Sequence, residues 1–541
     1  MDTELISIQL EDGTSVSAEQ AESATKTIQP KDAPGIIIAQ PETIGLYSVQ
    51  HLPFGPLFIA PKLKKAGFNV FIYDQRVDSK EKLESILENN NIMLMTFSVF
   101  TGPTILTALA LAKEVKAKYP NLKFAFGGPH PMIAPVQTCQ HPLVDFVSTG
   151  DGEALLVELM DALIHNKDLK NINGLVFKDE NNQVIVNPPR KFLRMDDDVT
   201  MSLDLIDINK YIFEHEGLKT IHLLLSRGCP YRCNFCRQTI VNKRQWRKWG
   251  IDRVEQEIRP FIDADVKRII LQDDLVGDEK RVLELGKLFR RLGVEEWAME
   301  NGCRVDLLKS EEFFQGLQEL KCHHMSYGAE SGSQEILNSI DKDITPDMML
   351  NVARMGKKYG VGIKFSWMLG LPNETKKQAL ETLDLIDRIK EIAPDTSCAM
   401  SLFSPYPGTP MYQQALEKGW QPPQSFEEWG IFREEAIYPY LGNWKWYKSI
   451  ILSAYFIAAG DTQYIVWKKV GWKLLPFYKL LYWTASLRWK ARFFSFPVEY
   501  DMVQFFWDMK KKLMIQGFFA RMKSLGSRLV YPFRINTPYP V

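Results

Sequence analysis

Residues 223–238 read LLLSRGCPYRCNFCRQ, an apolar strand that runs directly into a C-x3-C-x2-C loop. The three cysteines of this loop are Cys229, Cys233 and Cys236. Three thiolates at this spacing suit three irons of a cubane cluster, and they leave the fourth iron open to a substrate or cofactor. A closed structural site would normally use four protein ligands. The alternatives are a zinc site completed by a distant fourth ligand and a redox C-x2-C pair.

Length and composition limit the class of protein that contains this loop. A chain of 541 residues, 45% of them apolar, is long enough for two or three domains with large cores. A formal net charge of zero argues against a general nucleic-acid binder. Seven cysteines are too few and too unevenly placed for a disulfide scaffold, so we expect a reducing, oxygen-poor cytoplasm. Residues 1–34 are polar, and we expect a loose tail with no signal peptide.

Residues 35–185 alternate short apolar strands with helices, which predicts a doubly wound, flavodoxin-like parallel sheet. In such sheets, ligands lie beyond the carboxyl ends of the strands. Those ends are expected at Gln40–Leu57, Ser98–Pro103, Gly127–Pro131 and Gly150–Glu153.

The next two segments differ in pattern. Residues 186–215 carry prolines and acidic residues without a strong period and are expected to form a linker. Residues 216–430 contain six strand-helix repeats, which fit a partial (β/α)6 barrel with its chemistry at the carboxyl ends of the strands.

The cysteine loop, with the aromatic Phe235 just before its third cysteine, resembles the signature of radical S-adenosylmethionine (SAM) enzymes. The first unit resembles the cobalamin-binding (B12-binding) domain that precedes many radical SAM domains. The matching pieces are LPFGPLFIAPKLKKAGFNVFIYD (52–74), the GGPHP turn (127–131) and VDFVSTGDGEA (144–154). The cofactors that this resemblance implies are a [4Fe-4S] cluster, SAM and cobalamin.

The resemblance also implies residues that contact SAM. SYGAESGS (326–333) is similar to a glycine-glycine-glutamate segment, with Ala329 in place of the second glycine. Glu330 would accept the SAM ammonium and Gly328 would keep the backbone close. Arg304 would meet the SAM carboxylate or ribose, or else form an ordinary salt bridge. The full set expected at SAM is Phe235, Arg304, Gly328, Glu330 and Ser366.

Two acidic residues, Asp273 and Asp274, resemble the acidic strand end of the family; the alternative is that they cap the following helix.

For cobalamin, the resemblance implies contacts from small residues at strand ends. A D-x-H-x-x-G motif is absent, and His51 and His130 are not in that context, so cobalamin would be held without a protein histidine on cobalt. The alternative is a flavodoxin-like domain that does not bind cobalamin. The residues expected to contact cobalamin are Gly127, Gly128, Gly150, Gly152 and Glu153.

Taken together, these resemblances imply an enzyme. A reduced cluster would cleave SAM to a 5′-deoxyadenosyl radical, and cobalamin would carry a methyl group to an unactivated carbon of a small molecule, lipid or tetrapyrrole. An electron donor such as flavodoxin or ferredoxin is expected. The alternatives are an oxidative cyclase or rearrangement enzyme, similar to the anaerobic magnesium-protoporphyrin ester cyclase, and a non-catalytic iron-sulfur or cobalamin sensor. The sequence assigns no side chain to quench the product radical.

Residues 431–541 are basic and aromatic. From Asp461 onward there are fourteen Lys and Arg against four Asp and Glu, and stretches such as KKVGWKLLPFYKLLYW (468–483) predict amphipathic helices. No run is apolar for long enough to span a bilayer. These helices are expected either to close the barrel and line the substrate pocket, or to lie on an anionic membrane surface and make the protein peripheral to the membrane.

Overall fold

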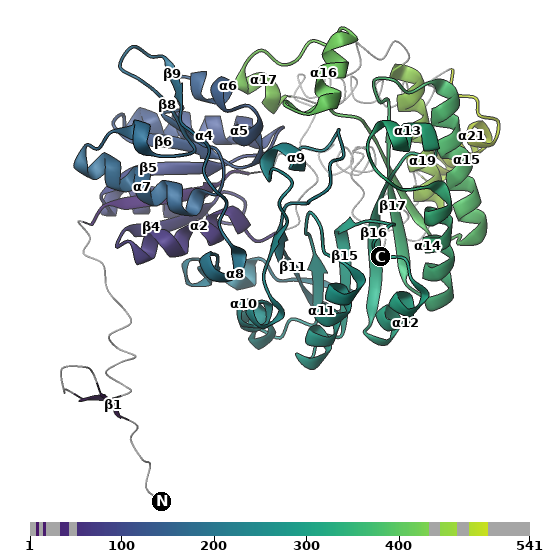
Figure 1. The fold of residues 1–541 in the computed structure, drawn as a ribbon, viewed down its shortest axis with the longest axis horizontal. Helices are drawn as coiled ribbons and strands as arrows, with labels where there is room; N and C mark the ends of the chain where they lie inside the picture. Colours follow the sequence, from purple (N-terminus) through teal and green to yellow (C-terminus); the bar gives the residue numbers. More distant parts are fainter. Residues whose placement is uncertain are drawn as a thin grey trace, which may run out of the picture.

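The computed structural model describes residues 7–9, 15–17, 33–42, 51–431, 444–461 and 475–495. Two seven-stranded sheets organise these residues, one on each side of the molecule (Figure 1). In the expected tail, β1 (Ser7–Gln9) and β2 (Ser15–Ser17) pair antiparallel, so this part of the tail has some regular structure.

The first sheet has the strand order β4-β3-β5-β6-β7-β8-β9. Its first five strands are parallel and follow the flavodoxin-like order, while β8 and β9 extend the sheet as an antiparallel pair. The strands are β3 (Gly35–Gln40), β4 (Asn69–Asp74), β5 (Ile92–Ser98), β6 (Lys123–Gly127), β7 (Phe146–Ser148), β8 (Leu175–Lys178) and β9 (Val184–Val186). The helices are α2 (Phe54–Lys65), α3 (Lys80–Asn89), α4 (Thr104–Lys118), α5 (Pro129–Ile133), α6 (Pro135–Gln140) and α7 (Gly152–His165).

Helices cover both faces of this sheet, so strand β3 is buried along its whole length. Ile36 and Ile38 of β3 pack into the core that also contains α2 and α7, and this core continues into the second half of the chain. Ile37 and Ala39 face the opposite core, beneath α3 and α4. The predicted doubly wound fold is confirmed.

The second sheet has the order β10-β11-β14-β15-β16-β17-β18. The six strands from β11 to β18 are parallel and form an open, curled half-barrel, as the six repeats predict. The strands are β10 (Phe213–His215), β11 (Leu218–Leu223), β14 (Arg268–Leu271), β15 (Glu296–Cys303), β16 (Cys322–Glu330), β17 (Gly362–Leu369) and β18 (Ser397–Leu402). The helices are α10 (Ile251–Asp263), α11 (Glu279–Arg291), α12 (Glu311–Glu319), α13 (Gln334–Ser339), α14 (Pro346–Tyr359) and α15 (Lys376–Ile392).

Local sequence explains these helices. In α10, Val254, Ile258 and Phe261 recur at helical spacing and are buried. At the start of α15, Thr375 accepts a hydrogen bond from the Gln378 N–H and the Gln378 side chain bonds back to Thr375, which is a complete capping box.

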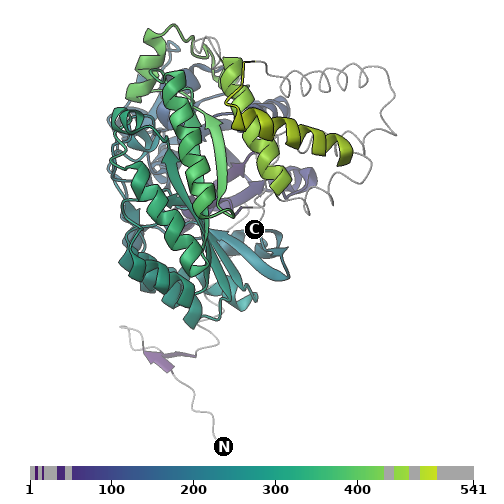
Figure 2. The same cartoon turned by 90° about the vertical axis from the view of Figure 1, so that its right-hand side faces the viewer.

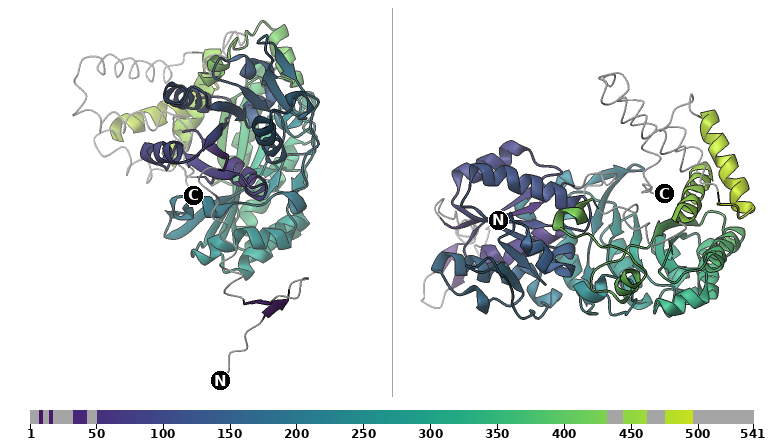
Figure 3. Two further views of the ribbon diagram at one scale, coloured as in Figure 1. Left: turned by 90° about the vertical axis from the view of Figure 1, so that its left-hand side faces the viewer. Right: turned by 90° about the horizontal axis from the view of Figure 1, so that it is seen from above.

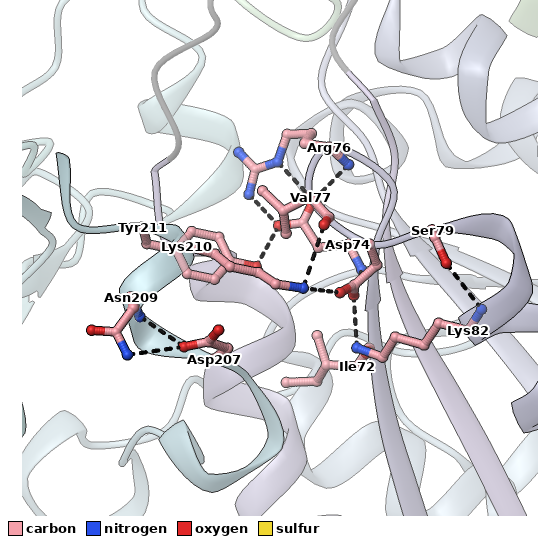
Figure 4. Close-up of polar contacts among 11 residues, drawn as sticks. Ile72, Asp74, Arg76, Val77, Ser79, Lys82, Asp207, Asn209, Lys210 and Tyr211 are labelled. Carbon is pink, nitrogen blue, oxygen red and sulfur yellow. Dashed lines mark hydrogen bonds and ion pairs between the residues drawn. The ribbon is translucent and has the colours of Figure 1, made fainter.

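The segment expected as a linker contains short elements and is attached to both sheets. These elements are α8 (Met195–Asp198), two 3-10 turns (Leu203–Leu205 and Ile208–Lys210) and β10, which pairs with β11. Figure 4 shows how it meets the end of β4: Tyr211 donates to Asp74 over 2.9 Å, and Lys210 pairs with Asp78 over 3.0 Å. Asp74 also binds Arg76, which closes the network.

Residues after the barrel return to the first sheet. In α17 (Phe426–Gly430), Trp429 donates to Gln137 over 2.6 Å, and Phe426 stacks on His130 with ring centroids 5.6 Å apart. Together with Trp420, which follows α16 (Pro410–Glu417), they complete the core beneath α4. Trp420, Phe426 and Trp429 were expected to belong to the barrel. They pack instead against the first sheet and its helices.

Two further helices, α19 (Trp444–Asp461), which lies beside β18, and α21 (Leu475–Lys490), which packs along α19, lie at the end of the barrel away from the first sheet (Figures 2 and 3). The C-terminal region is therefore helical where it is described. The parts of the expected basic helices that fall on residues 462–474 and 496–541 lie outside the described residues. Among the described helices, none combines the length and apolar character needed to cross a bilayer.

Candidate cofactor sites

The cysteine loop begins two residues after the short strand β12 (Ser226–Arg227) and ends just before α9 (Gln238–Val241). Two acids that follow β14 bind the residues that lead into the cysteine loop. Asp273 accepts hydrogen bonds from the Leu225 N–H and the Ser226 hydroxyl, and Asp274 accepts from the Gly228 N–H over 2.9 Å.

The following helix, α11, is capped by Asp278, which accepts from the Arg281 N–H. The alternative that Asp273 and Asp274 cap this helix is therefore wrong. Asp273 is buried and Asp274 is exposed, and burial raises the pKa of Asp273 to about 7.

The three cysteine thiols lie within electrostatic reach of one another. Burial raises the pKa of Cys229 and raises that of Cys236 to about 11, and Cys233 adds to both shifts. Nearby cationic side chains act in the opposite direction, and Arg304 donates to the Cys233 sulfur over 3.6 Å. Since iron binds the thiolate, this positive charge suits the site to a cluster.

Within the described ranges, no three His, Cys, Asp or Glu side chains are grouped to hold a single metal ion. A cubane cluster has a different requirement, because each thiolate binds its own iron.

Arg304 connects the end of β15 to the cysteine loop. Its guanidinium pairs with Asp306 over 3.0 Å, donates to the Lys342 carbonyl over 2.6 Å and stacks over the Tyr231 ring at 3.5 Å. The ordinary salt bridge considered for Arg304 is therefore present, together with the contact to Cys233. A contact between Arg304 and SAM stays a prediction.

Lys342 is a site residue that the sequence analysis missed. Its ammonium is buried and pairs with Glu330 over 2.8 Å, and it lies 6.0 Å from the centre of the Phe235 ring. The segment Asp341–Asp343 looks like an exposed acidic loop in the sequence. Asp341 and Asp343 both have positive φ, and this tight turn accompanies the buried Lys342 side chain.

Because Gly328 has no side chain, there is room for the ion pair between Glu330 and Lys342. A Cβ at Gly328 would lie 2.5 Å from the Glu330 carboxylate and 3.0 Å from the Lys342 ammonium. Ser366 of β17 is opposite Gly328 in the strand register. The structure therefore brings Phe235, Arg304, Gly328 and Glu330 together around Lys342, beside the cysteine loop, with Ser366 on the neighbouring strand.

The glycines expected at cobalamin differ in their surroundings. Gly150 has φ +127°, and a Cβ added there would have no neighbouring atom within 4 Å, so its backbone is open to a ligand. A Cβ at Gly128 would lie 2.9 Å from the Val99 backbone, and one at Gly152 would lie 3.1 Å from Ile59, so packing already requires both to be small. Gly127 ends β6, and the atom nearest to a Cβ there would be 3.6 Å away.

Glu153 faces the second half of the chain. Its side chain is 1% exposed and pairs with Arg227 over 2.7 Å. Asp151, two residues earlier in the same turn, pairs with Arg227 over 3.3 Å and with Arg247. A contact between Glu153 and cobalamin stays a prediction.

Both histidines considered in the first domain have protein partners. The Nδ1 atoms of His51 and His222 are 2.5 Å apart, and burial lowers the pKa of His51 to about 4. His130 bonds the Thr101 hydroxyl over 2.9 Å, and burial lowers its pKa to about 3.

The two expected cofactor sites are adjacent. Arg227 is two residues before Cys229, and it bonds the Asp151–Glu153 turn of the first sheet. On the other side of the loop, α9 contacts α5, which contains part of the GGPHP turn. Figure 1 shows α9 between the two halves.

Comparison with known proteins agrees with this arrangement. The B12 binding domain family matches residues 46–160, and the radical SAM superfamily matches residues 223–386. An uncharacterized methyltransferase of Pyrococcus horikoshii is 30% identical over 322 residues, which cover 58% of this chain and 68% of that protein. This chain belongs to the cobalamin-dependent radical SAM enzymes. The cofactors of this enzyme are a [4Fe-4S] cluster, SAM and cobalamin.

Two further proteins are similar to this enzyme, one in sequence and one in fold. The anaerobic magnesium-protoporphyrin IX monomethyl ester cyclase of Cereibacter sphaeroides is 25% identical over 377 residues, 67% of this chain and 60% of the cyclase. The structure of the cobalamin-dependent SAM radical enzyme OxsB, with aqua-cobalamin and SAM bound, has the same fold, with a TM-score of 0.68 at 13% identity. That match covers 97% of this chain and 87% of OxsB.

Proposed function

We propose that this radical SAM enzyme is a C-methyltransferase that methylates an unactivated carbon of a small-molecule, lipid or tetrapyrrole substrate. The cluster and SAM, when bound, supply a radical that can take hydrogen from such a carbon, and cobalamin supplies a methyl carrier. The observation that carries the proposal is the ion pair between Arg227 and Glu153, because it joins the turn expected at cobalamin to the loop expected at the cluster.

The residues of the chain have separate roles in this proposal. Cys229, Cys233 and Cys236 hold three irons. Arg304, which donates to the Cys233 sulfur, favours the thiolate form that iron requires. Glu330, which now pairs with Lys342, accepts the ammonium of SAM.

Gly150, with its open backbone, would allow cobalamin to approach closely, together with the neighbouring strand ends at Gly127 and Gly128.

Water exclusion is a further role for the protein, because a carbon radical must be protected from side reactions. The Arg227 side chain stacks on Phe58 at 4.5 Å, and Arg247 stacks on Phe192 at 4.4 Å. The first contact lies between the two halves beside the cysteine loop, and the second joins the linker segment to the second half.

The second candidate is an oxidative cyclase or rearrangement enzyme that transfers no methyl group. The observation that favours it is the 25% identity to a magnesium-protoporphyrin ester cyclase over 67% of this chain. Both candidates need the same cluster residues, so the structure of the cysteine loop does not separate them.

The products of SAM separate these two functions. The reconstituted enzyme would be incubated under reducing, anaerobic conditions with methyl-labelled SAM and with extracted lipid and small-molecule fractions. Methyl transfer predicts S-adenosylhomocysteine together with 5′-deoxyadenosine, and label in an extracted compound. A cyclase predicts 5′-deoxyadenosine alone. If the enzyme makes neither product, both candidates fail.

The electron donor is also a proposal. A flavodoxin or ferredoxin with its reductase should replace a chemical reductant in this assay, since the cluster must be reduced before SAM is cleaved. Equal SAM cleavage with and without the donor protein, at matched reductase, would contradict it.

A further inference from the structure

Helix α21 has two clearly different faces. Leu481, Ala485 and Trp489 recur every four residues, are buried and face the body of the protein. The Trp489 indole donates to Asp387 of α15 over 2.7 Å, and α21 packs along α19. One face of α21 is thus fixed to the barrel, and the opposite face is directed outward.

The outward face is apolar where a surface helix would normally be polar. Leu480, Trp483 and Leu487 lie at positions i, i+3 and i+7, which form one stripe, and they are 53%, 61% and 55% exposed. Phe493, just after the helix, is 48% exposed. These are half of the eight large hydrophobic side chains that the described part of the chain exposes, and they are concentrated in one short segment. Such a concentration marks an interaction surface.

The charged residues within this segment are all basic. Residues 475–495 contain Lys479, Arg488, Lys490 and Arg492 and no Asp or Glu. Lys479 and Lys490 are exposed and lie at the two ends of the stripe. Two acids of the neighbouring α15, Asp384 and Asp387, share Arg492 over 2.6 and 2.7 Å, so the charge of this arginine is offset by its two partners.

We propose that the outer face of α21 binds the surface of an anionic lipid bilayer. Leucine and tryptophan side chains in one stripe insert at the headgroup level, and lysines at its ends bind lipid phosphates. Charge complementarity selects this partner, because the four basic residues of this segment outnumber the two acids of α15 that pair with it, and a bilayer rich in anionic lipid attracts the remaining positive charge. The helix lies in the plane of the surface, since it is not long and apolar enough to cross a bilayer.

This docking also bears on the proposed function, and to that extent it depends on it. An enzyme held at a bilayer surface by the side of its barrel is placed to take a substrate dissolved in lipid. Within the proposed substrate classes, the α21 surface therefore favours an apolar lipid or a tetrapyrrole over a small polar molecule.

Vesicle binding tests the proposal without cofactors or substrate. The full chain would be floated with vesicles of phosphatidylcholine alone and with vesicles containing phosphatidylglycerol, at low and high salt. We expect binding to the anionic vesicles that weakens with salt. The triple variant L480S/W483S/L487S should bind at least tenfold more weakly, and each of Lys479→Gln and Lys490→Gln should cost about fivefold.

Val186→Ser is the matched control, since Val186 is 55% exposed on the distant strand β9. It should bind like the wild type. Absence of binding by the wild type, or undiminished binding by the triple variant at equal thermal stability, would overturn the proposal. A wild-type dimer that the triple variant abolishes would instead show that the stripe contacts a second copy, and would also overturn it. None of these outcomes affects the product assay for methyl transfer.

Discussion

Arg227 and Glu153 form a buried ion pair, 2.7 Å long, that joins the two halves of the enzyme. Arg227 lies just before the cysteine loop, and Glu153 lies in the first turn of α7 in the first domain. A buried charge is stable only with a partner, so this pair defines how the two domains meet. It places the two expected cofactor sites next to each other.

Replacing Arg227 with methionine should destabilise the enzyme by about 3 kcal/mol, because Glu153 would be left buried without a counter-charge. The measurement is the free energy of unfolding from denaturant titration. The double variant R227M/E153Q should recover part of the loss, because it removes the unpaired charge. Equal stability of Arg227→Met and the wild type would show that the pair does not hold the domains together.

Replacing Cys233 with alanine should remove most of the iron, because a cluster would be left with two thiolate ligands. Cys398→Ala is the control, since Cys398 lies on β18 outside the loop. Iron content after anaerobic reconstitution, with the visible spectrum, distinguishes the two variants. Full iron loading of Cys233→Ala would contradict the assignment of the cluster to this loop.

Replacing Glu330 with glutamine should weaken SAM binding tenfold to a hundredfold, since a hydrogen bond to a charged group contributes about 1.5–3 kcal/mol. Iron content should not change. The control is Glu335→Gln, an exposed neighbour on α13. Equilibrium binding of SAM to the reconstituted enzyme gives the affinities. If Glu330→Gln binds SAM like the wild type, Glu330 does not accept the ammonium.

Acid should destabilise the enzyme through His130. Burial lowers its pKa to about 3, whereas the unfolded chain has an ordinary value of 6.5. Between these values the unfolded state binds more protons than the folded state, so stability is present above pH 6.5 and is lost as the pH falls. In His130→Gln, the slope of unfolding free energy against pH between 4 and 6 should decrease by about 1.4 kcal/mol per pH unit. Parallel slopes in variant and wild type would show that His130 is protonated in the folded state.

The sequence predicted those features that depend on local pattern. The cysteine loop, the segment around Glu330 and the alternation of strands and helices are short-range signals, and both sheets follow from them. Contacts between residues distant in the chain could not be predicted from such short-range signals. The turn that buries Lys342, and the return of Phe426 and Trp429 to the first sheet, are decided by partners distant in the chain. Glu153 is the same case, since its partner Arg227 lies in the other half of the chain.

The most direct test of the account is the iron and cobalt content of the wild-type chain after anaerobic reconstitution with iron, sulfide and hydroxocobalamin. Adjacent cluster and cobalamin sites predict about four irons and one cobalt per chain. Retention of iron without cobalt would contradict the claim that the first domain brings cobalamin beside the cluster.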